Sequence, residues 1–200
     1  MDLLHQQLRG YHLILASASP RRIDLLKELK LSFDCIPLDV DEAFPAHLKD
    51  HEVARFLAHL KAEAFPAEKL TSKSILITAD TIVCLGDQIL GKPENRDHAI
   101  EMLRNLSGKM HKVITGVCIR SHDKETIFSN ETDVYFCQLS DDEIVYYVDQ
   151  FKPFDKAGAY GIQEWIGYIG IEKIEGSYFN VMGLPIQQLY RELQKFVSNE

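Results

Sequence analysis

The sequence has few cysteines and no long hydrophobic run. Its cysteines are Cys35, Cys84, Cys118 and Cys137, and no two of them form a Cys-x-x-Cys pair. We therefore expect free thiols, mostly buried, in a reducing compartment. No apolar run approaches the roughly 20 residues that a membrane-spanning helix requires. The first residues lack the basic and apolar regions of a signal peptide, so we expect a cytoplasmic protein without a membrane partner.

Positive charge is also scarce. The chain has 200 residues, and 22 basic against 30 acidic residues give a formal net charge of −8. An acidic chain is a poor candidate for binding nucleic acid or a membrane over a broad surface. A local basic pocket for a small anion remains compatible with this charge. The length suffices for one or at most two domains with a hydrophobic core.

Several common catalytic motifs are missing. Ser107-Gly108-Lys109-Met110 lacks both the Ser or Thr after the lysine and the upstream glycine of a Walker A loop. No Gly-x-Ser-x-Gly elbow indicates a serine hydrolase. His47 and His51 are four residues apart at an expected helix start, but they have no obvious third ligand, which makes a zinc site there a minor alternative.

Strand-like and helical patterns alternate along the chain, without repeats. Extended segments are expected at 11–16, 33–40, 74–79, 82–90 (a hairpin around Gly86-Asp87), 111–121 and 126–138, and helices at 20–31, 51–65, 96–106, 140–150 and 185–197. Residues 153–183 show no clear pattern. Helices alternating with long antiparallel-looking strands predict an α/β fold with a mixed twisted sheet and flanking helices.

The most informative stretch reads Ser17-Ala18-Ser19-Pro20-Arg21-Arg22. It lies between a strand-like run and an amphipathic helix, with Ser19 as the expected N-cap and Pro20 at the first helical position. Two hydroxyls, two guanidiniums and the free N–H groups of a helix start together favour binding of an anion such as phosphate. An ordinary capped helix with two surface arginines explains this segment equally well on its own.

Four further positions are candidates for chemistry. Asp80 follows the apolar run 75–77, at what we expect to be the carboxyl end of a central strand, where open α/β sheets bind ligands; a turn aspartate is the alternative. The acids in Asp39-Val40-Asp41-Glu42 suit Mg²⁺, although a solvated acidic loop is the commoner case. Gly91-Lys92-Pro93 presents either a fixed cation or a solvated lysine. Lys61 either snorkels from an apolar helix face or faces a cleft.

Taken in order, these motifs resemble those of a known family. They are Leu15-Ala16-Ser17-Ala18-Ser19-Pro20-Arg21-Arg22, Asp41-Glu42, Lys61-Ala62, Ala79-Asp80-Thr81, Gly91-Lys92-Pro93, Leu106-Ser107-Gly108 with Ile114-Thr115-Gly116, residues 155–163 (Asp-Lys-Ala-Gly-Ala-Tyr-Gly-Ile-Gln), and Val181-Met182-Gly183-Leu184-Pro185. Each is weak alone, but together over nearly the whole chain they resemble the Maf proteins, which are nucleoside-triphosphate pyrophosphatases.

The resemblance implies a fold and a reaction. The fold would be a single domain over residues 1–200, with two lobes around a cleft, similar to inosine-triphosphate pyrophosphatases. The reaction would be that of a nucleotide diphosphatase, a hydrolase that cleaves between the α- and β-phosphates of a nucleoside triphosphate. A divalent metal cation, Mg²⁺ or Mn²⁺, would be the cofactor, and the protein would often be a homodimer.

The resemblance also assigns roles to residues. The Ala-Tyr-Gly-Ile-Gln string is similar to the branch that prefers dTTP and UTP. In that branch Asp80 matches the proton acceptor. The specificity positions match Arg21, Thr81 and Gln163; the metal-side acids match Asp41 or Glu42, beside Asp80; and the phosphate-side groups match Arg21, Arg22, Lys61 and Lys92, with Ser17 and Ser19 in the same loop as the arginines.

The chain departs from the family pattern at one point. Where the family commonly has a Gly-Arg-Gly-like run after the glutamine, this chain reads Glu164-Trp165-Ile166-Gly167, which removes a basic residue beside Gln163. The departure bears on the base pocket and on a dimer contact. Two rival functions remain: a nucleotide-binding regulator of cell division without turnover, and a pyrophosphatase for modified guanine nucleotides.

Overall fold

The computed structural model describes residues 3–198 and contains both helices and strands. The α-helices are α1 (Leu4–Gln7), α2 (Pro20–Glu28), α3 (His51–Glu63), α4 (Arg96–Leu106), α5 (Asp141–Phe151), α6 (Trp165–Gly170), α7 (Tyr178–Met182) and α8 (Ile186–Ser198), and the short 3₁₀ helices are η1 (Ala67–Lys69) and η2 (Ala157–Ala159). Within this range no helix combines the length and the apolar character needed to cross a membrane.

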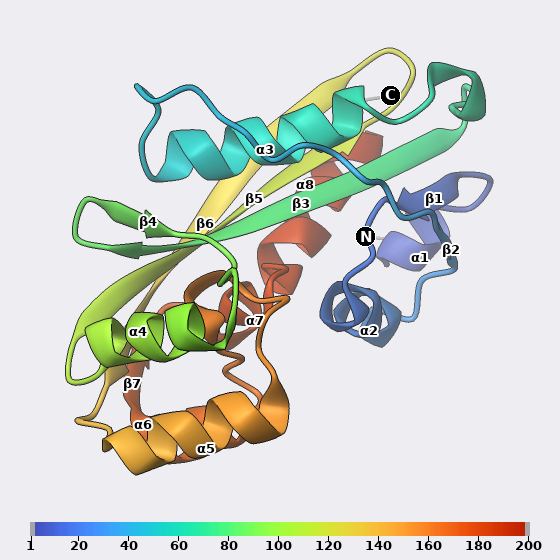
Figure 1. The fold of residues 1–200 in the computed structure, drawn as a ribbon. Helices are drawn as coiled ribbons and strands as arrows, with labels where there is room; N and C mark the ends of the chain where they lie inside the picture. The colour runs from blue at the N-terminus through green and yellow to red at the C-terminus, as the bar shows by residue number, and fades with distance from the viewer. Residues whose placement is uncertain (1–2, 199–200) are drawn as a thin grey trace. The chain divides into compact units, whose positions relative to one another are not determined.

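The strands form one mixed sheet (Figure 1). They are β1 (His12–Leu15), β2 (Phe33–Cys35), β3 (Ser74–Leu85), β4 (Gln88–Leu90), β5 (Met110–Arg120), β6 (Glu125–Phe136) and β7 (Ile171–Glu175). The order is β2-β1-β3-β5-β6-β7, with β4 paired to β3. β1 runs parallel to β2 and β3, whereas β3–β4 and β6–β7 are antiparallel. The expected α/β fold with a mixed sheet is therefore confirmed.

The chain divides into two compact units. The first comprises the residues up to Asp80, Thr115–Asn130 and the segment from Gly183 on, and the second comprises Thr81–Ile114 and Glu131–Met182. Strands β3, β5 and β6 each contribute residues to both units. Two units agree with the two expected lobes. A cleft between them, and a single domain over residues 1–200, stay predictions.

In the first unit, helix α3 covers the sheet. Its side chains Ala58 and Ala62 are buried in a cluster that includes Ile14, Leu76 and Cys118. On β5, a Cβ at Gly116 would lie 2.0 Å from the Ala54 carbonyl oxygen, so only glycine allows the α3 backbone this close. The tight contact fixes the side chains that α3 carries, including Lys61.

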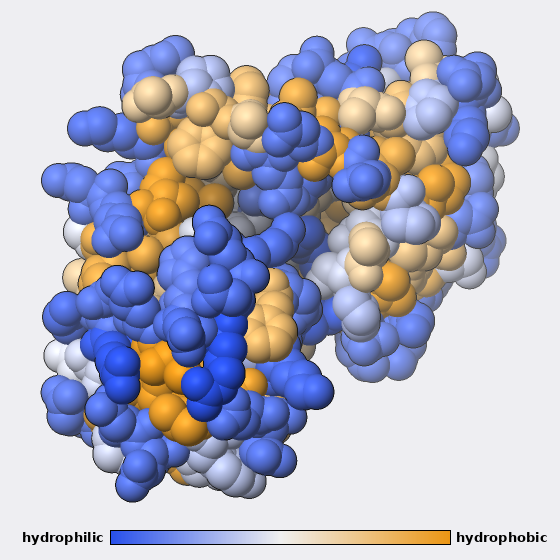
Figure 2. All heavy atoms as spheres, in the orientation of Figure 1, coloured by the Kyte–Doolittle hydropathy of each residue, from blue (hydrophilic) through white to orange (hydrophobic). Residues whose placement is uncertain are grey.

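In the second unit, helices α4 and α5 lie beside each other (Figure 1). Helix α5 begins with the capping box expected from the sequence: the Ser140 hydroxyl accepts from Glu143 N, and the Glu143 carboxylate accepts from Ser140 N. Leu103, Leu106, Ile144 and other side chains from both helices form the core of this unit. Figure 2 shows apolar side chains reaching the surface near α4 in small groups among hydrophilic ones.

The sequence located most elements but did not predict α1 or η1, and of the extended segment 33–40 only Phe33–Cys35 is a strand. Three further differences concern β3, the stretch 153–183 and the cysteines. First, β3 does not end at residue 79; it continues to Leu85 because its last three residues pair with β4, which confirms the hairpin at Gly86-Asp87. Second, the unassigned stretch 153–183 contains η2, α6, β7 and α7, which are all short. Third, all four cysteines are free, but Cys35 is exposed and Cys137 is only partly buried, because β2 lies at the sheet edge and Cys137 just beyond β6.

Candidate active site

The loop after β1 leads directly into helix α2. The Ala16 N–H still donates to Ile77 O on β3 at 2.9 Å, so the loop begins at the carboxyl end of the parallel pair β1–β3. The buried Ser17 hydroxyl accepts a hydrogen bond from Ser19 N at 3.1 Å. Ser19 occupies the N-cap position and Pro20 the first helical position, as expected, but the Ser19 side chain makes no capping hydrogen bond. Its hydroxyl therefore does not cover the start of α2.

Arg22 is fixed among charged groups of the first unit. Its Nε donates to the Gly183 carbonyl oxygen at 2.7 Å. Burial lowers the pKa of the Arg22 guanidinium, the charges of Asp80 and Glu42 raise it, and that of Arg21 lowers it further. Arg22 is therefore close enough to both carboxylates to sense their charge, while one of its N–H groups holds the main chain before α8.

Lys61 joins two carboxylates. Its Nζ on α3 donates to Glu42 Oε1 at 2.8 Å and to Asp80 Oδ1. The Lys61 and Asp80 side chains are only 14% and 9% exposed, so this ion pair is largely removed from water. Asp41 Oδ1 instead accepts from the Ala43 backbone N–H at 3.2 Å. Of the two adjacent acids, Glu42 is the one in contact with the Lys61–Asp80 pair.

Asp80 lies within β3, not at its end, which corrects the expectation from the sequence. The register with β1 ends at Ile77 and the register with β4 begins at Val83. Asp80 thus stands just beyond the carboxyl end of β1, on a strand that continues. Two residues earlier, the Thr78 hydroxyl donates to Ala58 O at 2.6 Å, which ties this part of β3 to α3 and hence to Lys61.

The carboxylates of Asp80 and Glu42 fit a divalent cation. Both approach the same ammonium, Lys61 Nζ, so the chain already holds one positive charge between them. Carboxylate oxygens are the ligands that Mg²⁺ and Mn²⁺ prefer, and Mg²⁺ usually takes only one or two from a protein, with phosphate and water completing its shell. The donor set of this cluster is therefore compatible with the cofactor that the sequence implied.

Three sequence-predicted residues belong to the second unit: Thr81, Lys92 and Gln163. Thr81 is partly buried and, as the next residue on β3, points to the opposite face from Asp80. Lys92 is exposed in the loop after β4, and the adjacent Gly91 O accepts from Gly158 N at 3.1 Å. That bond connects the Lys92 loop with η2, which precedes Gln163 in the chain.

Gln163 has a buried amide oxygen. Within residues 3–198 its Oε1 has no hydrogen-bond partner, which is costly unless a ligand or water supplies a donor. A Cβ at Gly161 would lie 2.9 Å from Gln163 Nε2, so the amide lies close against the loop at Gly161. The side chain thus presents an acceptor that the described residues leave unsatisfied.

The departure at Glu164 is part of a hydrogen-bond network that the sequence did not reveal. Glu164 accepts from the Tyr147 hydroxyl and lies 3.1 Å from Lys156 Nζ. Tyr147 in turn accepts from Gly161 N at 3.1 Å. Burial and the Glu164 carboxylate raise the pKa of Tyr147, so its hydroxyl stays protonated. Glu164, the residue after Gln163, is therefore held in place by Tyr147 on α5. Of the residues in this network, only Lys156 belongs to a motif noted in the sequence, the 155–163 motif.

The structure brings some of the expected site residues together and not others. Ser17, Arg22, Glu42, Lys61 and Asp80 lie in the first unit, and contacts or electrostatic interactions link the last four. Arg21 and Ser19 are adjacent to these residues in the chain, whereas Asp41 forms a hydrogen bond with the backbone of Ala43. Thr81, Lys92 and Gln163 lie in the second unit.

Comparison with known proteins places the chain in a family. The family model described as "Maf-like protein" matches residues 12–196. The chain belongs to this family. The match includes every residue singled out above, from Ser17 to Gln163, and confirms the resemblance based on the sequence motifs.

Individual relatives are similar over nearly their whole length. A protein of Parabacteroides distasonis is 50% identical over 192 residues, covering 96% of this chain and 99% of the relative. A Bacteroides fragilis protein is 53% identical over 189 residues, covering 94% and 97%, and one of Flavobacterium johnsoniae is 47% identical over 195 residues, covering 98% and 100%. All three are named dTTP/UTP pyrophosphatase.

Among solved structures, the Staphylococcus aureus Ham1 protein has the same fold. It matches with a TM-score of 0.54 at 16% identity, and the match covers 92% of this Maf-like chain and 99% of the Ham1 chain. At this identity the similarity establishes the architecture and not the chemistry.

Proposed function

We propose that this Maf-like protein is a pyrophosphatase that hydrolyses dTTP and UTP to the monophosphate and pyrophosphate. The observation that carries the proposal is the pair of carboxylates, Asp80 and Glu42, that Lys61 joins beside Arg22. Such a group supplies both negative charge for a metal and positive charge for phosphate. The name shared by relatives about 50% identical supplies the substrates.

Binding of the triphosphate is assigned to the start of α2 and to nearby cations. The N–H groups there, which the Ser19 side chain leaves uncovered, suit phosphate oxygens. Arg21 and Arg22 supply guanidiniums that bind phosphate in a bidentate manner. We assign Lys61, Lys92 and the hydroxyls of Ser17 and Ser19 to the same task, because all four residues belong to sequence motifs that resemble those of the Maf family.

Asp80 and Glu42 would hold the divalent metal, Mg²⁺ or Mn²⁺, and Asp41 would contribute at most indirectly. When bound, the metal neutralises phosphate charge and polarises the bond to be cleaved. Lys61, which pairs with both carboxylates in the free protein, would then be available to a phosphate oxygen. The ion pairs of Lys61 thus orient both carboxylates in the free protein.

Asp80 is the proposed proton acceptor. A carboxylate within hydrogen-bond reach of a water molecule can orient it and remove its proton as it attacks the α-phosphorus in line, with pyrophosphate as the leaving group. The neighbouring cations, Lys61 and Arg22, then stabilise the negative charge that develops on the phosphate oxygens. Asp80 is suited to this role because its backbone is part of β3 and its carboxylate is held by Lys61 on α3.

Recognition of the base is assigned to Gln163, with Thr81 and Arg21 as the other specificity positions. The amide presents a donor and an acceptor side by side, and thymine and uracil present the matching N3–H donor and 4-oxo acceptor. The buried and unpartnered Gln163 Oε1 is the acceptor that the base N3–H would satisfy. Tyr147, Lys156 and Glu164 hold the loop that carries this amide.

We further propose a homodimer in the cytoplasm. The second unit exposes large apolar side chains on α5, α6 and α7: Tyr146, Phe151, Tyr168, Ile169, Tyr178 and Phe179. Exposed apolar groups of this size favour a protein interface. The four free thiols are compatible with a reducing compartment. Light scattering after size exclusion measures the mass of the particle, and a value of one chain contradicts the dimer.

The function is tested with a panel of triphosphates. Purified protein is incubated with Mg²⁺ and equal concentrations of dTTP, UTP, CTP, dATP, dGTP and modified guanine triphosphates, and released pyrophosphate is measured. We expect dTTP and UTP to be consumed at least tenfold faster than the others. Binding of dTTP without turnover would instead support a regulator, and preference for modified guanine would support the other branch.

A further inference from the structure

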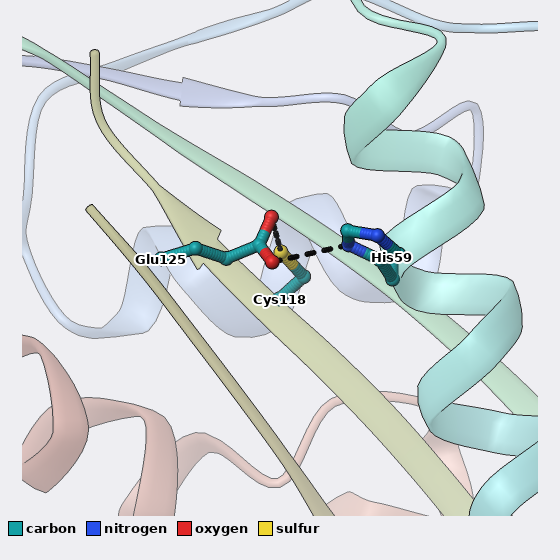
Figure 3. Close-up of side chains that lie close together, drawn as sticks. All are labelled: His59, Cys118 and Glu125. Carbon is teal, nitrogen blue, oxygen red and sulfur yellow. Dashed lines mark hydrogen bonds and ion pairs between the residues drawn. The ribbon is translucent and has the colours of Figure 1, made fainter. Parts of the chain in front are cut away.

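A second cluster of metal-ligating side chains lies in the first unit, where the mechanism does not use it (Figure 3). It consists of His59, Cys118 and Glu125, and the ligand atoms of all three lie within 4.8 Å of one another. His59 Nδ1 is 3.1 Å from Glu125 Oε1, and Cys118 Sγ is 3.4 Å from Glu125 Oε2. Figure 3 shows the three side chains converging from separate elements.

The three residues come from α3, β5 and β6, which are tightly packed. His59 is on α3, Cys118 on β5 and Glu125 at the first position of β6. The contact of α3 with Gly116, two residues before Cys118, fixes the distance between helix and sheet. His59 and Lys61 are two positions apart on α3, about 200° around the helix axis, so the cluster is directed away from the group that contains Asp80.

Hydrogen bonding alone accounts poorly for His59. Its Nδ1 is buried, yet among the described residues it has no partner with hydrogen-bond geometry, although Glu125 Oε1 is only 3.1 Å away. A buried ring nitrogen without a bond is unfavourable. Its lone pair is directed at a position near a thiol and a carboxylate, which is the arrangement of ligands around a metal ion.

The distances and donor types match zinc. Zinc bonds of about 2.0–2.3 Å at tetrahedral angles place neighbouring ligand atoms about 3.3–3.6 Å apart, close to the two separations above. Imidazole, thiolate and carboxylate together select a borderline-soft ion such as Zn²⁺ over Mg²⁺. In addition, His59 Nε2 lies 3.4 Å from Glu63 Oε1, and metal-bound histidines commonly direct the other ring N–H to a carboxylate.

We propose that His59, Cys118 and Glu125 bind a Zn²⁺ ion that joins α3 to the β5–β6 hairpin, with water as the fourth ligand. The bound ion gives His59 Nδ1 the partner that it lacks and holds the helix that carries Lys61 against the sheet. Burial and Glu125 raise the pKa of the Cys118 thiol, so the metal-free protein carries a thiol proton, and this proton is released when zinc binds.

The direct test uses the full chain without nucleotide, so its outcome is independent of the proposed reaction. Protein treated with a chelator and dialysed is titrated with Co²⁺ as a spectroscopic probe, and then with Zn²⁺ as competitor. We expect one equivalent of Co²⁺ to give a thiolate-to-metal charge-transfer band in the near ultraviolet, which Zn²⁺ abolishes. Zinc at 100 times its Kd should raise Tm by about 5–10 °C.

Matched variants assign the band to the cluster. Cys118→Ala should remove the band, whereas Cys84→Ala, at another buried cysteine, should keep it. Because Cys118→Ala can also affect folding, Glu125→Gln at the more exposed end of the cluster is the second variant, and we expect it to weaken Zn²⁺ binding at least tenfold. Absence of the band in the parent protein, or a band that Cys118→Ala retains, would overturn the proposal.

Discussion

Lys61 and Asp80 form an ion pair between helix α3 and strand β3, and both side chains are largely buried. Glu42 is the second partner of Lys61, so the ammonium neutralises part of the charge of two acids at once. Removing one partner of a buried ion pair is ordinarily costly because the other is left unpaired. Here Lys61 keeps one carboxylate partner when the other is substituted, so that cost is reduced. A loss of activity in such a variant can then be attributed to the missing carboxylate.

Asp80→Asn should abolish activity while the protein stays folded. The amide preserves shape and hydrogen bonding but removes the charge and basicity of the proton acceptor. Loss of a general base typically costs 10²–10⁴-fold in rate, and weaker metal binding adds to it. Steady-state kinetics with dTTP measure the effect, with Asp87→Asn in the exposed β3–β4 turn as the control. Turnover within about threefold of the parent would exclude this role for Asp80.

Glu42→Gln should impair the enzyme more than Asp41→Asn, although the two acids are adjacent. Only Glu42 contacts Lys61, whereas Asp41 accepts from the backbone of Ala43. We expect the Mg²⁺ concentration for half-maximal activity to rise at least tenfold for Glu42→Gln and less than threefold for Asp41→Asn. Equal effects, or the reverse order, would show that Asp41 is the metal-side acid.

Arg21→Ala and Arg22→Ala should each lower kcat/KM for dTTP. A hydrogen bond to a charged group contributes about 1.5–3 kcal/mol, which corresponds to about 10–150-fold. Arg22→Ala should also lower Tm by a few degrees, because Arg22 Nε binds Gly183 O; Arg21→Ala should not. Lys195→Ala, at an exposed position of α8, is the control. Unchanged kinetics in both arginine variants would refute the phosphate-binding role of the α2 start.

The fold class and several candidate site residues could be predicted from local patterns in the sequence, whereas Thr81 and Gln163 became candidates only through the family resemblance. The strand, turn and proline before Arg21 predicted the start of α2, and the capping box at Ser140 predicted α5. Local patterns failed where long-range pairing decides. β3 extends past Asp80 because β4 pairs with its end, and the contact of Lys61 with Glu42 rather than Asp41 depends on how two distant segments meet.

The sequence also missed groups joined only by the tertiary structure. Tyr147 occupies an ordinary buried position of α5, so nothing in its spacing indicates a bond to Glu164, and the short elements between 153 and 183 have no periodicity. His59 is far in the sequence from Cys118 and Glu125. The three residues therefore have none of the short spacings that are typical of metal ligands. Only the packing of α3 on β5 and β6 brings them together.

Gln163→Leu should reduce the preference for pyrimidines more than it slows hydrolysis. Losing a matched buried pair costs about 1–3 kcal/mol because a polar group is left unpaired, which is about 5–150-fold in discrimination. Competition between dTTP and dATP at equal concentrations measures the preference. Glu164→Gln should give a smaller change in the same direction, because Tyr147 and Lys156 then hold the loop less firmly. An unchanged preference in Gln163→Leu would contradict the base contact.

Stability should fall as pH decreases from about 6.5 to 4, partly through His111. Burial lowers the pKa of His111 to about 4, and its Nε2 pairs with the Tyr160 hydroxyl at 2.7 Å. Because the unfolded chain binds the proton near pH 6.5, it holds more protons than the folded chain over this interval, so acid favours unfolding. The full contribution is about 3 kcal/mol, present above pH 6.5.

Urea unfolding at several pH values measures this contribution. We expect His111→Gln to reduce the slope of unfolding free energy against pH between 4.5 and 6.5, whatever its effect on stability at pH 7. His122→Gln, at an exposed histidine, should leave the slope unchanged. A parent slope that His111→Gln does not alter would show that another group controls the acid transition.

Transfer of ¹⁸O from the solvent shows which phosphorus atom of dTTP is attacked by water, which we propose to be the α-phosphorus. Hydrolysis of dTTP is run with Mg²⁺ in water enriched in ¹⁸O. The products are then separated, and their masses are measured by mass spectrometry. We expect dTMP and pyrophosphate, with a single ¹⁸O in dTMP and none in pyrophosphate. Label in pyrophosphate would place the attack on the β-phosphorus, and formation of dTDP and phosphate would contradict the reaction altogether.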